Sequence, residues 1–162
     1  MKYCIGIGYD IHRFVKGKKL FLGGIKIPCA WGLFGHSDAD VLLHAICDAF
    51  LGAVCAGDIG SHFPDTDPKY KGISSVILLE KVYALVKRKG FKINNIDTII
   101  IAQKPRLEGF KENIANNIAR VLKVDPAIVN VKAKTNEGLG AVGENKAIVA
   151  YAAVSLNSEK KK

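Results

Sequence analysis

A nearly continuous apolar segment, residues 41–54, dominates the hydrophobic pattern of the chain. Ser37 or Asp38 before it is a good helix cap, and the glycine-containing run 52–57 ends it, so the pattern predicts a buried helix. The polar exceptions within this region, spaced four residues apart on one side of the helix, are Asp40, His44 and Asp48. Because unpaired buried charge is costly, these side chains need partners, and the helix is the first candidate for a site.

Alternating and periodic patterns elsewhere predict the remaining elements. Strands are expected at residues 3–9, 20–28, 96–103, 129–135 and 147–156, and helices at 75–89 and 108–124. The segment 20–28, broken at Gly23-Gly24, is either a strand or a hairpin arm, and the last two strands are expected to pair as a hairpin. Together the elements predict an α+β domain, a two-layer sandwich with a mixed four-stranded sheet and helices on one face.

Length and charge narrow the class of protein. At 162 residues we expect one domain over residues 1–157 and a lysine-rich tail over 158–162. The net charge of +9 is spread over separate lysine groups without interleaved aromatic residues, which argues against a nucleic-acid partner and favours an anionic small molecule. No apolar run reaches the roughly 18 residues of a membrane span, and the N-terminus lacks a signal-peptide pattern, so we expect no membrane contact and a cytoplasmic location.

A possible metal site combines two distant segments. Asp10 and His12 follow the first strand pattern two residues apart, so their side chains lie on the same face. With His44 from the buried helix they form a set of three ligands suited to zinc, and three protein ligands leave a fourth position open, as in catalytic sites. The alternative is a surface His12 and a core His44 hydrogen-bonded to Asp40 or Asp48.

Two further segments carry groups that suit phosphate. His36 and Ser37 precede the buried helix, where free backbone N–H groups and the helix dipole favour an anion, although a simple cap would use the same residues. Near the C-terminus, lysines and Thr135 offer phosphate donors, and Glu137 adds one hard carboxylate of the kind that Mg²⁺ prefers.

Two loops allow more than one interpretation. The run 63–68, Phe-Pro-Asp-Thr-Asp-Pro, forms either Asx-turns or a carboxylate wall for a hydroxylated ligand. The run 138–143 matches G-x-G-x-x-G but precedes a strand pattern and has no βαβ unit after it, so we reject a dinucleotide site and predict a tight turn.

Five motifs in order extend over the whole chain apart from its lysine tail. They are G-Y-D-I-H, H-S-D-A-D-V-L-L-H-A-I-C-D-A, G-D-I-G-x-x-F-P-D-T-D-P, I-I-A-Q-x-P and N-V-K-A-x-T-x-E-x-L-G. In this combination the chain closely resembles the 2-C-methyl-D-erythritol 2,4-cyclodiphosphate synthase family of the non-mevalonate isoprenoid pathway. The resemblance implies a chorismate-mutase-like fold and a homotrimer with active sites between adjacent subunits. It implies a metal-assisted intramolecular phosphoryl transfer that releases CMP from a cytidine diphosphate substrate.

The resemblance also assigns metals. It implies one zinc ion per subunit on Asp10, His12 and His44, with Asp10 and His12 also counted among the substrate-binding residues. Glu137 matches the carboxylate that helps to bind Mg²⁺ or Mn²⁺ at the substrate diphosphate. Asp48 matches a carboxylate that orients a zinc histidine, whereas Asp40 is expected to have a structural role.

Substrate contacts follow from the same resemblance. His36 and Ser37 match residues that hold the attacking 2-phosphate, Thr135 matches the hydroxyl on the α-phosphate side, and His36 with Thr135 would stabilise the transition state. The residues that match the methylerythritol site are Asp58, Ile59, Gly60, Phe63, Asp65 and Asp67. Those that match the cytidine pocket are Ala102, Arg106, Leu107, Ala133 and Lys134.

Several positions depart from the family pattern, and two of them lie along the trimer axis that the resemblance implies. Ala141 and Glu144 stand where members often carry Phe and Arg along the trimer axis, and we expect Glu144 to repel an isoprenoid diphosphate there. Two other classes of protein stay open: a zinc hydrolase that uses metal-bound water, and a basic domain that binds RNA.

Overall fold

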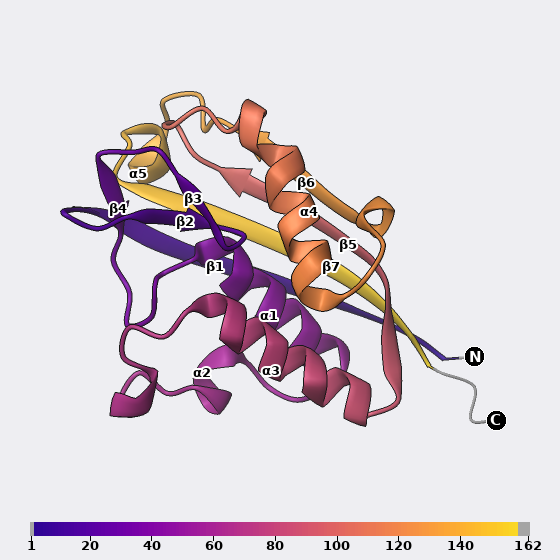
Figure 1. Ribbon diagram of the computed structural model, residues 1–162. Coiled ribbons are helices and arrows are strands. Elements are labelled where there is room, and N and C mark those ends of the chain that lie inside the picture. Colours follow the sequence, from indigo (N-terminus) through magenta and orange to yellow (C-terminus); the bar gives the residue numbers. More distant parts are fainter. Residues whose placement is uncertain (1, 159–162) are drawn as a thin grey trace.

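The computed structural model describes residues 2–158 and consists of one main sheet covered by helices on one face (Figure 1). The main sheet has the order β4-β1-β7-β5-β6, and a separate ribbon pairs β2 with β3. The strands are β1 Tyr3–Lys16, β2 Leu20–Leu22, β3 Ile25–Ile27, β4 Trp31–Leu33, β5 Phe91–Ile101, β6 Val129–Lys134 and β7 Ala147–Ser158. The helices are α1 Val41–Ala53, α2 Ile59–His62, α3 Ser75–Arg88, α4 Lys111–Leu122 and α5 Gly140–Gly143, with 3₁₀ turns at Pro68–Tyr70, Glu108–Phe110 and Pro126–Ile128.

The prediction of a mixed α+β sheet with helices on one face is confirmed, but the predicted strand number is wrong. The main sheet has five strands, because β4 pairs with the end of β1 in a register that includes Phe14↔Leu33. No hydrophobic pattern predicts β4, since its three residues are too few to show alternation. The segment 20–28 forms the β2-β3 hairpin outside the main sheet, with its turn at Gly23-Gly24.

The predicted C-terminal hairpin is also wrong. β6 pairs in parallel with β5, and β7 lies on the other side of β5, antiparallel to both β5 and β1. The physical reason is the helix α4, which carries the chain back so that β5 and β6 run in the same direction. β7 then pairs with β1 on one side and β5 on the other and completes the centre of the sheet.

Two glycines set the distance between the sheet and α1. A Cβ added to Gly6 would lie 1.9 Å from the Ala49 carbonyl oxygen, and one added to Gly8 would lie 1.9 Å from that of Ala45. The small residues of β1 therefore face the helix, and the large ones between them face the other way. This close approach brings His44 of α1 next to Asp10 and His12 in the second half of β1.

The helix α1 begins later than the sequence predicts. Its cap is Asp40, which accepts a hydrogen bond from the Leu43 N–H at 3.1 Å, and neither Ser37 nor Asp38 caps it. Ala39 has a left-handed backbone with φ of 59°, so the chain cannot be helical there and residues 35–40 form a tight loop. The cap prediction was wrong because this turn at Ala39 left no trace in the sequence.

The ends of the domain differ slightly from the prediction. Ser158, assigned to the tail, is the last residue of β7, and its N–H donates to the Lys2 carbonyl at 2.8 Å. Residues 159–162 of the predicted lysine tail lie outside the described residues. β1 continues to Lys16, whereas the prediction ended it at residue 9. The prediction was too short because the second half of the strand is rich in polar residues and shows no clear strand pattern. Among residues 2–158 no helix is long and apolar enough to cross a membrane.

Candidate functional site

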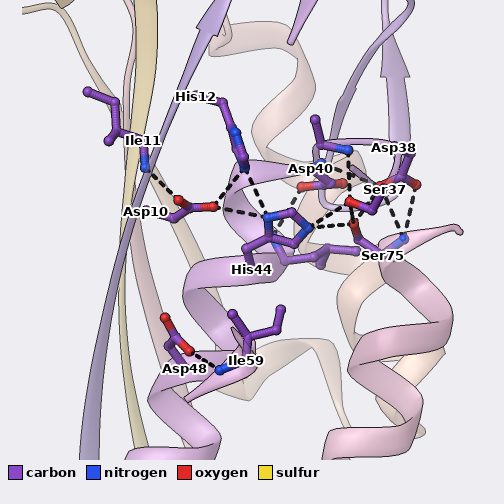
Figure 2. Close-up of polar contacts among 12 residues, drawn as sticks. Asp10, Ile11, His12, Ser37, Asp38, Asp40, His44, Asp48, Ile59 and Ser75 are labelled. Atoms are coloured by element: carbon purple, nitrogen blue, oxygen red, sulfur yellow. Dashed lines mark hydrogen bonds and ion pairs between the residues drawn. The ribbon is translucent and has the colours of Figure 1, made fainter. Parts of the chain in front are cut away.

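Asp10 and His12 of β1 meet His44 of α1 at the end of the sheet (Figure 2). The Asp10 Oδ2 atom lies 3.0 Å from both His12 Nε2 and His44 Nδ1, and these two nitrogens are 3.0 Å apart. Four ligands in a tetrahedron around zinc at 2.0–2.1 Å lie roughly 3.3 Å from one another. The three donor atoms are therefore arranged as one face of such a tetrahedron, and the cluster could hold a metal ion.

Asp10 enters this cluster as a carboxylate. Burial by itself would raise its pKa, but hydrogen bonds and charge interactions with His12 and His44 outweigh burial and hold the pKa well below its usual value. The Ile11 N–H donates to Asp10 Oδ1 at 2.8 Å and fixes the orientation of the group. Because metal ligands must be deprotonated, an ionised and oriented Asp10 suits the role.

The other ring nitrogen of His44 contacts two hydroxyl groups. His44 Nε2 lies 3.0 Å from Ser37 Oγ and 2.9 Å from Ser75 Oγ. Ser75 in turn donates from its hydroxyl to Asp38 Oδ1 at 2.5 Å. Asp38 and Ser75 were not predicted to belong to the site. Asp38 could have been considered, because it lies within the H-S-D-A-D motif. Nothing in the sequence pointed to Ser75, which reaches the site only because α3 packs beside α1.

The two other carboxylates of the helix stripe have separate partners. Asp40 is fully buried and accepts hydrogen bonds from the Gly23 and Gly24 N–H groups at 2.9 and 2.6 Å, which attaches the β2-β3 turn to α1. Asp48 accepts a hydrogen bond from the Ile59 N–H at 2.7 Å, and burial raises its pKa. The hydrogen bonds of His44 therefore go to Asp10, His12 and two serines. Asp48, which was predicted to orient a zinc histidine, is hydrogen-bonded to the start of α2 instead.

A cavity of about 320 Å³ opens next to the metal-binding cluster. It brings together most of the residues predicted to bind the phosphate and the polyol with two of the predicted zinc ligands. The former are His36, Ser37, Ile59, Gly60, Phe63 and Asp65, and the latter are His12 and His44. The Nε2 atom of His36 is buried and has no hydrogen-bond partner among the described residues. Since a buried polar atom without a partner is unfavourable, this nitrogen is available for a ligand in the cavity.

Asp58 and Asp67 were predicted to bind the same ligand but do not line this cavity. Asp58 caps α2 and accepts hydrogen bonds from the Ser61 N–H and hydroxyl at 2.8 and 2.7 Å. Asp67 caps the turn Pro68–Tyr70 and forms an ion pair with Lys69 at 2.6 Å. In this structure both carboxylates make local contacts that stabilise the loop.

The residues predicted to hold cytidine gather around a second cavity, of about 260 Å³. Its lining includes Ala102, Arg106, Leu107, Ala133, Lys134 and Thr135. The hydroxyl of Thr135 donates to the exposed carboxylate of Glu137 at 2.5 Å. Among residues 2–158 none lines both cavities, and the hydrogen bond of Thr135 goes to Glu137, not to His36 or to Asp10, His12 and His44.

The glycine-rich run 138–143, predicted to be a tight turn, contains the one-turn helix α5 at Gly140–Gly143. A Cβ on Gly143 would lie 2.1 Å from the Gly138 carbonyl carbon, so this turn closes on itself. Glu144 follows it on the surface and forms an ion pair with Lys146 at 2.5 Å.

Comparison with known proteins finds the same family throughout. The model of the YgbB family matches residues 3–157. A Syntrophobacter fumaroxidans protein named 2-C-methyl-D-erythritol 2,4-cyclodiphosphate synthase is 55% identical over 155 residues, which is 96% of this chain and 98% of the relative.

Solved structures agree with this match. The bifunctional IspDF from Campylobacter jejuni superimposes with a TM-score of 0.95 at 41% identity, covering 98% of this chain, which spans only 43% of that longer protein. The Plasmodium falciparum IspF structure, a complex with CDP, gives a TM-score of 0.85 at 38% identity over 98% of this chain and 97% of that one.

Proposed function

This chain belongs to the YgbB family, and on that premise we propose that it is a 2-C-methyl-D-erythritol 2,4-cyclodiphosphate synthase. The substrate would be 4-diphosphocytidyl-2-C-methyl-D-erythritol 2-phosphate. An oxygen of its 2-phosphate forms a bond to the β-phosphorus, the bond from this phosphorus to the α–β bridging oxygen breaks, and CMP leaves with that oxygen. The products are the cyclic diphosphate and CMP, which makes the enzyme a phosphorus–oxygen lyase.

The observation that carries the proposal is the metal-binding cluster beside a cavity lined by His36 and Ser37. His12 and His44 of the Asp10–His12–His44 set line a cavity to which His36 also contributes, and the buried Nε2 atom of His36 has no hydrogen-bond partner among the described residues. A phosphate held by His36 and Ser37 would lie near the cluster. Phosphoryl transfer depends mainly on positioning and on stabilising negative charge, so it needs these groups and no nucleophilic side chain.

Asp10, His12 and His44 would hold zinc, because one carboxylate and two imidazoles with an open fourth position match a catalytic zinc site. Zinc bound there would supply charge stabilisation at the phosphoryl oxygens. Glu137 would hold Mg²⁺ or Mn²⁺, since it is an exposed hard oxygen ligand next to the Thr135 hydroxyl. Thr135 would orient the α-phosphate, and backbone groups around the second cavity would hold the cytosine.

We also propose a homotrimer with active sites between subunits. The face of β1 away from the helices is apolar and exposed, with Ile5 and Ile7 at 75% and 80% exposure. Tyr9 of β1 and Tyr151 of β7 extend this face, with their rings 5.0 Å apart. An apolar surface of this kind is typical of a subunit interface. Joining chains would also allow the first cavity of one subunit to meet the second cavity of its neighbour.

The experiment that tests the function is phosphorus NMR of the purified protein with Mg²⁺, zinc and the cytidine substrate. We expect a cyclic diphosphate signal to appear as CMP is released, and a His36→Ala variant to lose it. Absence of both products with an intact zinc complement would contradict the proposal. Hydrolysis of an ester or amide instead would favour a zinc hydrolase, and tight, salt-sensitive RNA binding without zinc would favour a nucleic-acid-binding domain.

A further inference from the structure

We propose that Ser75 and Asp38 are positioning residues that set the tautomer and the orientation of His44 as a metal ligand. This inference rests on the metal assignment in the proposed function. It concerns residues that touch neither the cavity ligand nor the three donor atoms, and it follows from the hydrogen bonds on the far side of the His44 ring (Figure 2).

The direction of the hydrogen bonds is fixed by the number of protons. A serine hydroxyl has one proton, and Ser75 donates it to the carboxylate of Asp38 at 2.5 Å. The contact of 2.9 Å between Ser75 Oγ and His44 Nε2 must then be donated by the ring. With the ring proton held on Nε2, the lone pair of Nδ1 is free for a metal ion bound together with Asp10 and His12, in place of the hydrogen bond between Nδ1 and Asp10 Oδ2. Histidines that bind metals commonly donate their second N–H in this way, which fixes the ring and raises ligand basicity.

Ser75 is held more firmly than the second hydroxyl near the ring. It is fully buried, and its backbone N–H donates to both oxygens of Asp38 at 3.1 Å. Ser37 also lies 3.0 Å from His44 Nε2, but it lines the cavity, where a ligand can compete for its hydroxyl. Ser75 does not line the cavity. We therefore infer that Ser75 keeps the His44 proton in place when Ser37 turns to a bound phosphate.

The Asp38–Ser75 contact also joins two segments far apart in the sequence. Asp38 lies in the loop before α1, and Ser75 is the first residue of α3. Two backbone hydrogen bonds connect the same segments, from the Asp38 N–H to the Ile73 carbonyl at 3.0 Å and from the Gly72 N–H to the His36 carbonyl at 2.7 Å. The orientation of His44 therefore depends on the packing of α3 against this loop.

The test compares zinc affinity and tautomer in Ser75→Ala and Asp38→Asn with the wild type. By competition with a chromophoric chelator, we expect Ser75→Ala to bind zinc about 10–100-fold more weakly. Asp38→Asn keeps an oxygen acceptor but removes its charge, so we expect its zinc affinity to fall by about 10-fold, the lower end of this range. In metal-free protein with ¹⁵N-labelled histidine, Asp10 at 3.0 Å from Nδ1 favours the Nδ1–H form of His44 and Ser75 opposes it, so long-range correlation spectra should show a larger Nε2–H fraction in the wild type than in Ser75→Ala.

Ser74→Ala is the matched control. Ser74 is the N-cap of α3 and its hydroxyl accepts from the Val76 N–H, so the variant weakens the same helix end without touching His44. We expect lower thermal stability with unchanged zinc affinity and tautomer. Wild-type zinc affinity in both Ser75→Ala and Asp38→Asn, or an equal loss in Ser74→Ala, would overturn the inference. A wild-type protein that binds zinc but releases no CMP would overturn the proposed function and leave this inference intact.

Discussion

The two cavities of the chain differ in how far their polar groups are already fixed. At the first cavity, Asp10 and His44 have side chains that are 25% and 12% exposed, and each is hydrogen-bonded from more than one side. At the second, Glu137 is exposed on a loop, with a left-handed φ of 49°, and its contact is the Thr135 hydroxyl. The first group therefore has the donor geometry for an ion within one chain, whereas under the proposed function the second would become a site only with a substrate and a neighbouring subunit.

The largest effect should come from removing a ligand of the half-buried Asp10–His12–His44 cluster. We expect His44→Ala to lose bound zinc and to reduce CMP release by more than about 10³-fold, because losing a single charge-stabilising donor costs 10²–10³. Metal analysis after dialysis and steady-state assays check both. His62→Ala is the control, since His62 contacts the Ala56 carbonyl and lies outside the cluster. A full zinc complement in His44→Ala would show that His44 is no ligand.

A smaller effect is expected at the exposed carboxylate. Glu137→Gln keeps the shape of the side chain but removes its charge, so we expect kcat/KM to fall about 10²-fold with zinc content unchanged. The Mg²⁺ concentration that gives half of the maximal rate should be higher than in the wild type. Glu144→Ala is the control, because this exposed residue is paired with Lys146 and should leave turnover near the wild-type level. Wild-type kinetics in Glu137→Gln would remove its role with the second metal.

Mixing the two inactive variants tests whether the cavities combine across subunits. If each active site takes His44 from one chain and Glu137 from the next, random trimers of His44→Ala and Glu137→Gln contain about one quarter intact sites. We expect activity to recover to about that fraction after the mixed chains are unfolded and refolded together. If trimers of verified mixed composition recover no activity, each active site takes both residues from one chain.

The smallest effect concerns acid stability of the metal-free protein. The pKa of Asp10 is lower in the folded state than in the unfolded chain, so its contribution to stability is present above the unfolded pKa of about 3.9 and is lost as the pH falls through the lower folded value. The difference in free energy of unfolding between the wild type and Asp10→Asn should therefore shrink as the pH falls below about 4. Chemical denaturation at several pH values measures it. A difference that grows toward acid would contradict the lowered pKa.

Much of the first cavity could be predicted because its signals are local. The two-residue spacing of Asp10 and His12 and the polar positions on an apolar helix follow directly from strand and helix periodicity. The role of Ser75 could not be found in this way, since its contact with His44 depends on how α3 packs beside α1. The same limit applies to the order of the strands, because β7 pairs with β1 and β5 over long sequence separations.

The first strand shows a second limit. Alternation in C-I-G-I-G predicts two faces, but it does not tell which face is turned to the core. A hydrophobic count would place the isoleucines inside. The structure places Gly6 and Gly8 there, because only they allow the backbone of α1 to approach, and directs Ile5 and Ile7 outward.

Under the proposed association, the outward isoleucines of β1 would make the stability of this protein depend on its concentration. If the apolar face is covered only when chains associate, the folded state gains free energy by mass action, and the melting temperature should rise with protein concentration. A newly made chain would then aggregate least at a high concentration of its own copies, because the uncovered apolar face is also a surface to which unrelated chains can bind.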